Sequence, residues 1–125
     1  MRPMGLLLAT VFAGSVLALP EAGLAQCFDV AVTVAQTKPN GRPWDTEGGA
    51  YAPDIEIKLE ERTFPLCKDA FSCQAPGFRA SSRMVGVTVT DKDAQNDDVI
   101  GNGVCALNRG DCQVGQAYLR ATPCR

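Results

Sequence analysis

The sequence contains no histidine, a single tryptophan and few aromatic residues of any kind, which make up 6% of the 125-residue chain. Without histidine, the chain lacks the side chain that most often transfers protons near neutral pH and binds zinc or copper. It also lacks a G-x-S-x-G nucleophile motif and a C-x-x-C pair. Basic residues do not exceed acidic ones, and the net charge of -2 does not favour nucleic acid as a partner. These absences predict a binding protein that is not an enzyme.

Long hydrophobic runs are also missing, except for one near the start of the chain. Arg2 precedes an apolar run from Gly5 to Leu19, and small residues follow just before Ala25. This order is typical of a secretory signal peptide, and the run is shorter than the about 20 residues that span a membrane. We therefore expect residues 1–25 to be a signal peptide cleaved after Ala25. Residues 26–125 should then form one secreted or periplasmic domain.

The six cysteines all lie within residues 26–125. In a small exported domain they predict three disulfides, which can be paired in about 15 ways. Spacing alone suggests a tight loop, a hairpin and a link between the chain ends: Cys67–Cys73, Cys105–Cys112 and Cys27–Cys124. Lipid anchoring at Cys27 is the less favoured alternative, because Gln26 is not the small residue that normally precedes a lipidated cysteine. It would also leave an odd number of cysteines to pair.

Alternating apolar and polar residues predict several short strands. The alternation is clear over residues 28–35, 54–60 and 83–90, and a last strand is expected over 113–120. Residues 61–82 show no readable pattern. The outward charges of the second strand are typical of an antiparallel sheet with one solvated face. The expected fold class is therefore an all-β antiparallel β-sandwich stabilised by about three disulfides.

The densest polar feature is an acidic loop directly after the predicted strand at residues 83–90. It carries Asp91, Asp93, Asp97 and Asp98 within eight residues. Their mutual repulsion costs stability unless water or a cation screens it, and calcium prefers about six to eight oxygen ligands. Solvated aspartates at a loop tip are the simpler interpretation, because aspartate also favours turns. An EF-hand starting at Asp91 is excluded, since its sixth and twelfth positions hold asparagine in place of glycine and glutamate.

A second acidic segment favours the calcium interpretation. Asp45 and Asp54 belong to a Gly- and Pro-rich loop between two predicted strands. Together with the stretch VGVTVTDKDAQNDDVIG, this segment resembles the C2 domain family over residues 29–103. In that family, one calcium loop carries an aspartate, a short spacer and an aspartate that opens a strand. The other loop follows a valine-rich strand with Asp-x-Asp and then Asp-hydrophobic-Ile-Gly. The resemblance implies these calcium ligands: Asp45, Asp54, Asp91, Asp93 and Asp98, with Asp97 able to replace or supplement Asp98.

This chain departs from the family pattern in several respects. Its first-loop spacer is longer than usual, Asp54 is not followed by the Pro-aromatic pair, and the interval from Asp54 to Asp91 is short. The resemblance implies a monomeric β-sandwich whose loops bind calcium at one end. The bound ion would then bridge the loops to an anionic phospholipid membrane or to a protein or glycan partner. Trp44 and Tyr51 are candidates for membrane or partner contact, although a lone tryptophan in a small domain is more often a core residue. The alternative is a calcium-independent, secreted, disulfide-stabilised interaction or inhibitor domain.

Overall fold

The computed structural model describes residues 26–44, 52–93 and 96–125, so the predicted signal peptide lies outside the described residues. The described part of the chain forms eight strands and one short 3-10 helix. Their bounds are β1 Gln26–Val34, β2 Ile55–Leu59, β3 Arg62–Thr63, β4 Ser72–Ala80, β5 Met84–Asp91, β6 Asp98–Ala106, η3 Leu107–Arg109, β7 Asp111–Val114 and β8 Ala117–Pro123.

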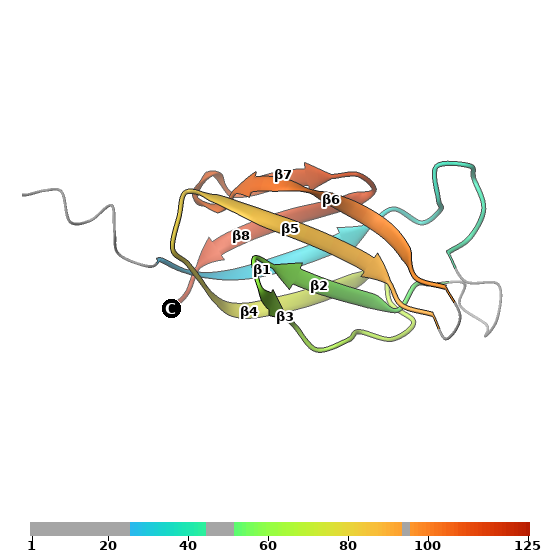
Figure 1. Ribbon diagram of the computed structural model, residues 1–125, viewed down its shortest axis with the longest axis horizontal. Coiled ribbons are helices and arrows are strands. Elements are labelled where there is room, and N and C mark those ends of the chain that lie inside the picture. The colour runs from blue at the N-terminus through green and yellow to red at the C-terminus, as the bar shows by residue number, and fades with distance from the viewer. Residues whose placement is uncertain (1–25, 45–51, 94–95) are drawn as a thin grey trace, which may run out of the picture.

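The strands form two four-stranded antiparallel sheets, with the orders β4-β1-β8-β7 and β3-β2-β5-β6. The two sheets lie face to face as a sandwich (Figure 1). The start of β1 and the C-terminus lie at one end of this sandwich, and the ends of β1 and β5 lie at the other (Figure 1). The segments that follow β1 and β5 therefore leave the sandwich at the same end.

The core lies between the two sheets and is built by the alternation of each strand. The inward side chains of β1, β2 and β5 are at most 4% exposed: Phe28, Val30, Val32, Val34, Ile55, Ile57, Leu59, Val85, Val87 and Val89. Burial of these apolar side chains is the main favourable contribution to folding, while the alternate residues face outwards. The predicted all-β antiparallel sandwich is confirmed.

Two parts of the chain differ from the sequence-based expectation. The prediction of a single strand over residues 113–120 is wrong. The chain reverses between Val114 and Ala117 and forms the hairpin β7–β8. Gly115 has a positive φ of 56°, which a two-residue hairpin loop favours at its first central position. The unreadable stretch at residues 61–82 contains β3 and the nine-residue strand β4.

One side of the sandwich is closed by the approach of β6 to the β7–β8 hairpin. Gln116 donates its backbone N–H to the carbonyl oxygen of Ile100 at 3.0 Å. A Cβ atom at Gly101 would overlap the backbone carbonyl of Val114. The absence of a side chain at Gly101 therefore helps the two sheets to approach at this side.

Gly101→Ala is expected to lower the free energy of unfolding by about 1–3 kcal/mol, because the added methyl group forces the β7 backbone away from β6. The matched control is Gly86→Ala in the neighbouring strand β5. There the added Cβ meets only the flexible carboxylate of Glu60 at 3.2 Å. Urea unfolding of both variants measures the difference. Equal stabilities of the two variants would contradict the close approach at Gly101.

The three disulfides have the pairing that the spacing suggested. The bonds Cys27–Cys124, Cys67–Cys73 and Cys105–Cys112 are all formed. Three disulfides in a domain of this size indicate an oxidising compartment, either extracellular or periplasmic. The disulfide of Cys27 engages the sulfur atom that a lipid anchor would need. Within the described residues, no helix is long and apolar enough to cross a membrane.

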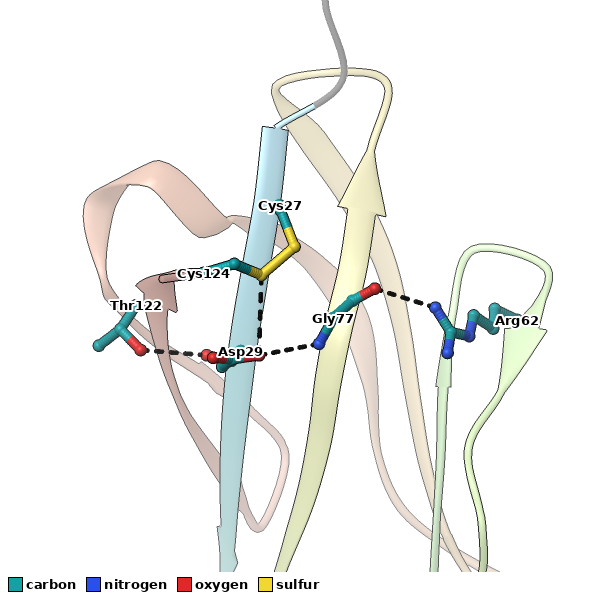
Figure 2. The surroundings of a disulfide bond; sticks show 6 residues. All are labelled: Cys27, Asp29, Arg62, Gly77, Thr122 and Cys124. Atoms are coloured by element: carbon teal, nitrogen blue, oxygen red, sulfur yellow. Dashed lines mark hydrogen bonds between the residues drawn. A yellow bond between two sulfur atoms is a disulfide. The ribbon is translucent and has the colours of Figure 1, made fainter.

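The Cys27–Cys124 disulfide joins β1 to the end of the chain beside Asp29. Figure 2 shows Asp29 on β1, between Cys124 and Gly77 of β4. Its carboxylate accepts the Gly77 N–H at 2.8 Å, and the Gly77 carbonyl accepts a hydrogen bond from Arg62 at 3.0 Å. The register between β1 and β4 shifts at this point, between Phe28 and Val30. Asp29 therefore satisfies the Gly77 N–H where the bulge interrupts the ladder.

Candidate metal centre

Three aspartates meet at the end of the sandwich where β5 ends and β6 begins. Asp91 is the last residue of β5, Asp98 is the first of β6, and the two are direct partners in the antiparallel ladder. Asp93 follows β5 by two residues. One carboxylate oxygen of each of these residues lies within 4.8 Å of the others. The valine-rich strand and the returning strand thus bring together Asp91, Asp93 and Asp98, which we call the acidic triad.

Asp91 is the buried member of the acidic triad. Only 1% of the residue is exposed, because its side chain points inward like Val85, Val87 and Val89 on the same strand. Its Oδ1 accepts the backbone N–H of Asp54 at 2.9 Å. Its Oδ2 is buried and has no hydrogen-bond partner among the described residues. A buried carboxylate oxygen without a partner is costly, and it marks the position where a further positive group would be most stabilising.

The electrostatics of the acidic triad follow from this burial. Desolvation raises the pKa of the Asp91 carboxyl to about 6, the Asp54 N–H opposes that rise, and the negative charges of Asp93, Asp54 and Asp98 add to it. Asp98 stands directly opposite Asp91 across the ladder, an arrangement in which like charges are destabilising. The triad therefore strongly favours any group that brings positive charge.

Asp54 lies next to the acidic triad, but its carboxylate accepts a hydrogen bond from a residue outside the triad. Its Oδ1 accepts the backbone N–H of Asp69 at 2.8 Å, while its backbone carbonyl accepts the N–H of Lys92 at 2.9 Å. Together with the bond from its N–H to Asp91, these contacts attach the start of β2 to the end of β5. The structure therefore shows Asp54 as a support for Asp91, and the three-carboxylate cluster does not include it.

Asp97 closes the loop that carries Asp93. Its Oδ2 pairs with the Lys92 ammonium at 2.8 Å, and its Oδ1 accepts the backbone N–H of Asp93 at 3.0 Å. The hydrogen bond from Lys92 holds the pKa of the Asp97 carboxyl below its ordinary value. Asp97 shapes the loop with both of its oxygens and, like Asp54, is not part of the acidic triad.

Lys38 contacts the acidic triad, and neither acidic motif of the sequence predicts this contact. It lies just after β1, and its Nζ is 3.1 Å from Oδ2 of Asp98. The two residues are 60 positions apart in the numbering, so no local motif joins them. Among the described residues, Lys38 brings positive charge to the triad itself, whereas Lys92 pairs with Asp97.

The two aromatic candidates for membrane contact have different outcomes. Trp44 is 4% exposed, and its indole N–H donates to the carbonyl oxygen of Ala35 at 2.7 Å. Trp44 is therefore a core residue that anchors the segment after β1, and its suggested membrane contact is wrong. Tyr51 lies outside the described residues, as does the predicted ligand Asp45.

The donors at this end of the sandwich fit a hard cation. The chain has no histidine and all six cysteines are in disulfides, so the side-chain ligands that converge here are carboxylate oxygens. Carboxylates and backbone carbonyls suit calcium, magnesium or manganese, while soft metals prefer sulfur and nitrogen. Of these ions calcium fits best at the irregular end of two strands, because calcium accepts irregular coordination and magnesium demands a near-octahedral site.

Comparison with protein-family models and with curated proteins finds no match to this chain. Membership of the C2 family therefore stays a prediction from the two acidic motifs. A function for the chain has to be inferred from the acidic triad and the residues around it.

Proposed function

We propose that this protein is an exported calcium-binding module in which Asp91, Asp93 and Asp98 hold the ion. The observation that carries the proposal is the buried carboxylate of Asp91. Its Oδ2 lacks a hydrogen-bond partner among the described residues, and one oxygen of Asp91 lies within 4.8 Å of an oxygen of each of two further carboxylates. A merely solvated turn would leave all three aspartates in water, which the 1% exposure of Asp91 contradicts.

A divalent cation would offset two costs at once. It would satisfy the buried carboxylate, and it would screen the repulsion between the facing residues Asp91 and Asp98. Asp54 and Asp97 would keep the ligands in place from outside, through the hydrogen bonds that they make to Asp91 and to the Asp93 backbone. Calcium binding is therefore expected to stabilise the fold.

The partner that we propose is an anionic surface, with an anionic phospholipid membrane as the first candidate. Unscreened carboxylates repel such a surface, and a bound divalent ion reverses the local field. Val99, next to Asp98 on β6, is 62% exposed at the same end of the sandwich and adds apolar surface there. The C2 resemblance points in the same direction, since membrane contact through calcium loops is what that resemblance implies.

Calcium is expected to raise the midpoint of thermal unfolding by roughly 5 °C or more. Exported calcium modules bind with dissociation constants of about 10⁻⁴ to 10⁻³ M, so about 10 mM calcium should stabilise the folded state by about 1.4–2.7 kcal/mol. In a domain of this size, each kcal/mol shifts the midpoint by roughly 4–8 °C. Scanning calorimetry of the oxidised protein with calcium and with chelator measures the shift.

Two variants separate a specific site from general charge screening. Asp93→Asn removes an exposed ligand of the triad and should abolish the shift. Asp111→Asn removes another exposed carboxylate, on β7 and paired with Arg120, and should leave the shift unchanged. No shift in the wild-type protein would refute the proposal and favour the calcium-independent interaction domain.

Binding to lipid vesicles tests the proposed membrane partner separately from the metal site. Co-sedimentation with phosphatidylserine-containing vesicles should require calcium and should be lost in Asp93→Asn. A calcium-induced thermal shift without any vesicle binding would keep the metal site and reject the membrane as its partner.

A further inference from the structure

The segment after β1 is shaped to present Lys38 to the acidic triad. Lys38 donates its backbone N–H to the carbonyl of Arg42 at 2.8 Å, and its own carbonyl accepts the N–H of Gly41 at 2.9 Å. Gly41 has a positive φ of 83°, which closes this tight turn at no steric cost. Trp44 anchors the same segment in the core through its bond to Ala35. The Lys38 backbone is thus held in place independently of its ammonium group.

Asp98 is likewise held in place without help from Lys38. It is paired to Asp91 by the β5–β6 ladder, which fixes its backbone at the end of the sandwich. The contact between Lys38 Nζ and Asp98 Oδ2 at 3.1 Å therefore joins two groups whose positions are set by the fold. Their side chains remain 30% and 42% exposed, so the ammonium can leave the carboxylate for water.

We propose that Lys38 is a built-in competitor of the metal ion, which occupies Asp98 in the calcium-free protein and is displaced when calcium binds. This inference rests on the proposed calcium site and adds a residue that sets its affinity. The observations that carry it are the direct contact with one of the three triad carboxylates and the independent fixation of both partners. Lys92 has a different role, because it pairs with Asp97 outside the triad.

The competition is electrostatic. An ammonium and a divalent ion that share one carboxylate repel each other, so one of the two has to give way. At solvent-like screening, charges of +2 and +1 about 6 Å apart weaken binding roughly tenfold. The coupling is reciprocal. If the Lys38–Asp98 pair lowers the affinity for calcium, bound calcium must weaken that pair by the same factor. Lys38 therefore raises the calcium concentration at which the site fills.

Lys38→Met tests the competition, because methionine keeps the length of the side chain and removes its charge. The matched control is Lys58→Met, which removes an exposed lysine from β2 in the same sheet as the triad. Calcium titration by calorimetry should show roughly tenfold tighter binding to Lys38→Met. For Lys58→Met we expect less than a twofold change, since Lys58 stands opposite Thr88, three residues along β5 from Asp91, and salt screens exposed charges at about this separation. Unchanged or weaker binding to Lys38→Met would overturn the inference.

A second measurement follows the displaced ammonium in the wild-type protein. Acetylation of lysines by an amine-reactive reagent, read by mass spectrometry, should become faster at Lys38 when calcium is added and stay constant at Lys58. Equal rates at Lys38 with and without calcium would show that the ion pair persists and would reject the competition. If the wild-type protein binds no calcium at all, the proposed function fails, whereas calcium binding without these Lys38 effects refutes the competitor role alone.

Discussion

Replacing Cys27 and Cys124 together by alanine is expected to lower the free energy of unfolding by about 4–5 kcal/mol. The disulfide joins residues 97 positions apart, so it restricts the unfolded chain over almost the whole domain. In the chain-entropy model, a closed loop of about 100 residues contributes about 4.7 kcal/mol at 25 °C, and a loop of about 15 residues contributes about 3 kcal/mol. Both cysteines are only partly buried, so little packing is lost with them. A loss of this size is a large fraction of the stability of a small domain.

Urea unfolding of the oxidised double variant measures this loss. Thr122→Ala is the control for local disturbance of the chain end. It removes an exposed hydroxyl that donates to the Asp29 carbonyl at 3.5 Å and should change the stability by less than about 0.5 kcal/mol. A loss below about 1 kcal/mol in the cysteine variant would show that the ladder between β1 and β8 already restricts the chain ends. The chain-entropy explanation would then be wrong for this disulfide.

Much of the fold could be predicted because its signals are local. The alternation of valines in β1 and β5 places one face of each strand in the core, and these two strands match the predicted ranges to within two residues. The disulfide pairing also followed from spacing, since neighbouring cysteines close short loops and leave the two outer ones to each other. The β7–β8 hairpin was missed because a glycine within an alternating stretch can either continue a strand or reverse it.

The candidate site could be predicted only in part, because its chemistry depends on contacts between distant segments. Asp-x-Asp after a valine-rich strand indicated Asp91 and Asp93, and the Asp-hydrophobic-Ile-Gly motif indicated Asp98, which the cross-strand register places opposite Asp91. The Asp69 N–H that engages the Asp54 carboxylate lies in a stretch without a readable pattern. The contact of Lys38 with Asp98 depends on how the segment after β1 packs at the end of the sandwich. Sequence patterns therefore identify the residue types of such a site better than their roles.

In the calcium-free protein, the buried carboxyl of Asp91 is expected to make stability fall as the pH rises from about 4 to about 7. Desolvation raises its folded-state pKa from 3.8 to about 6. The folded protein therefore binds this proton more tightly than the unfolded chain does. Stability is fully present below about pH 4, falls as the pH rises towards 6 and levels off above it. At about 1.4 kcal/mol for each pKa unit, the loss is at most about 3 kcal/mol.

Asp91→Asn isolates this contribution from those of the other carboxylates. The amide oxygen can still accept the Asp54 N–H, but the side chain no longer ionises. With chelator present, urea unfolding at several pH values should show that the variant lacks the decline between pH 4 and 7. At neutral pH it should be more stable than the wild-type protein by up to about 3 kcal/mol.

A wild-type curve that runs parallel to that of Asp91→Asn would show that Asp91 is not desolvated, and the main support for the metal centre would be lost. Calcium should affect the two proteins differently. It should restore at neutral pH the stability that ionised Asp91 removes in the wild-type protein, because binding to the folded state alone stabilises it. It should do little for the variant, which has lost the buried charge that the ion would neutralise. A carboxylate that destabilises the calcium-free fold and stabilises the calcium-bound one is what separates a metal ligand from a solvated turn residue.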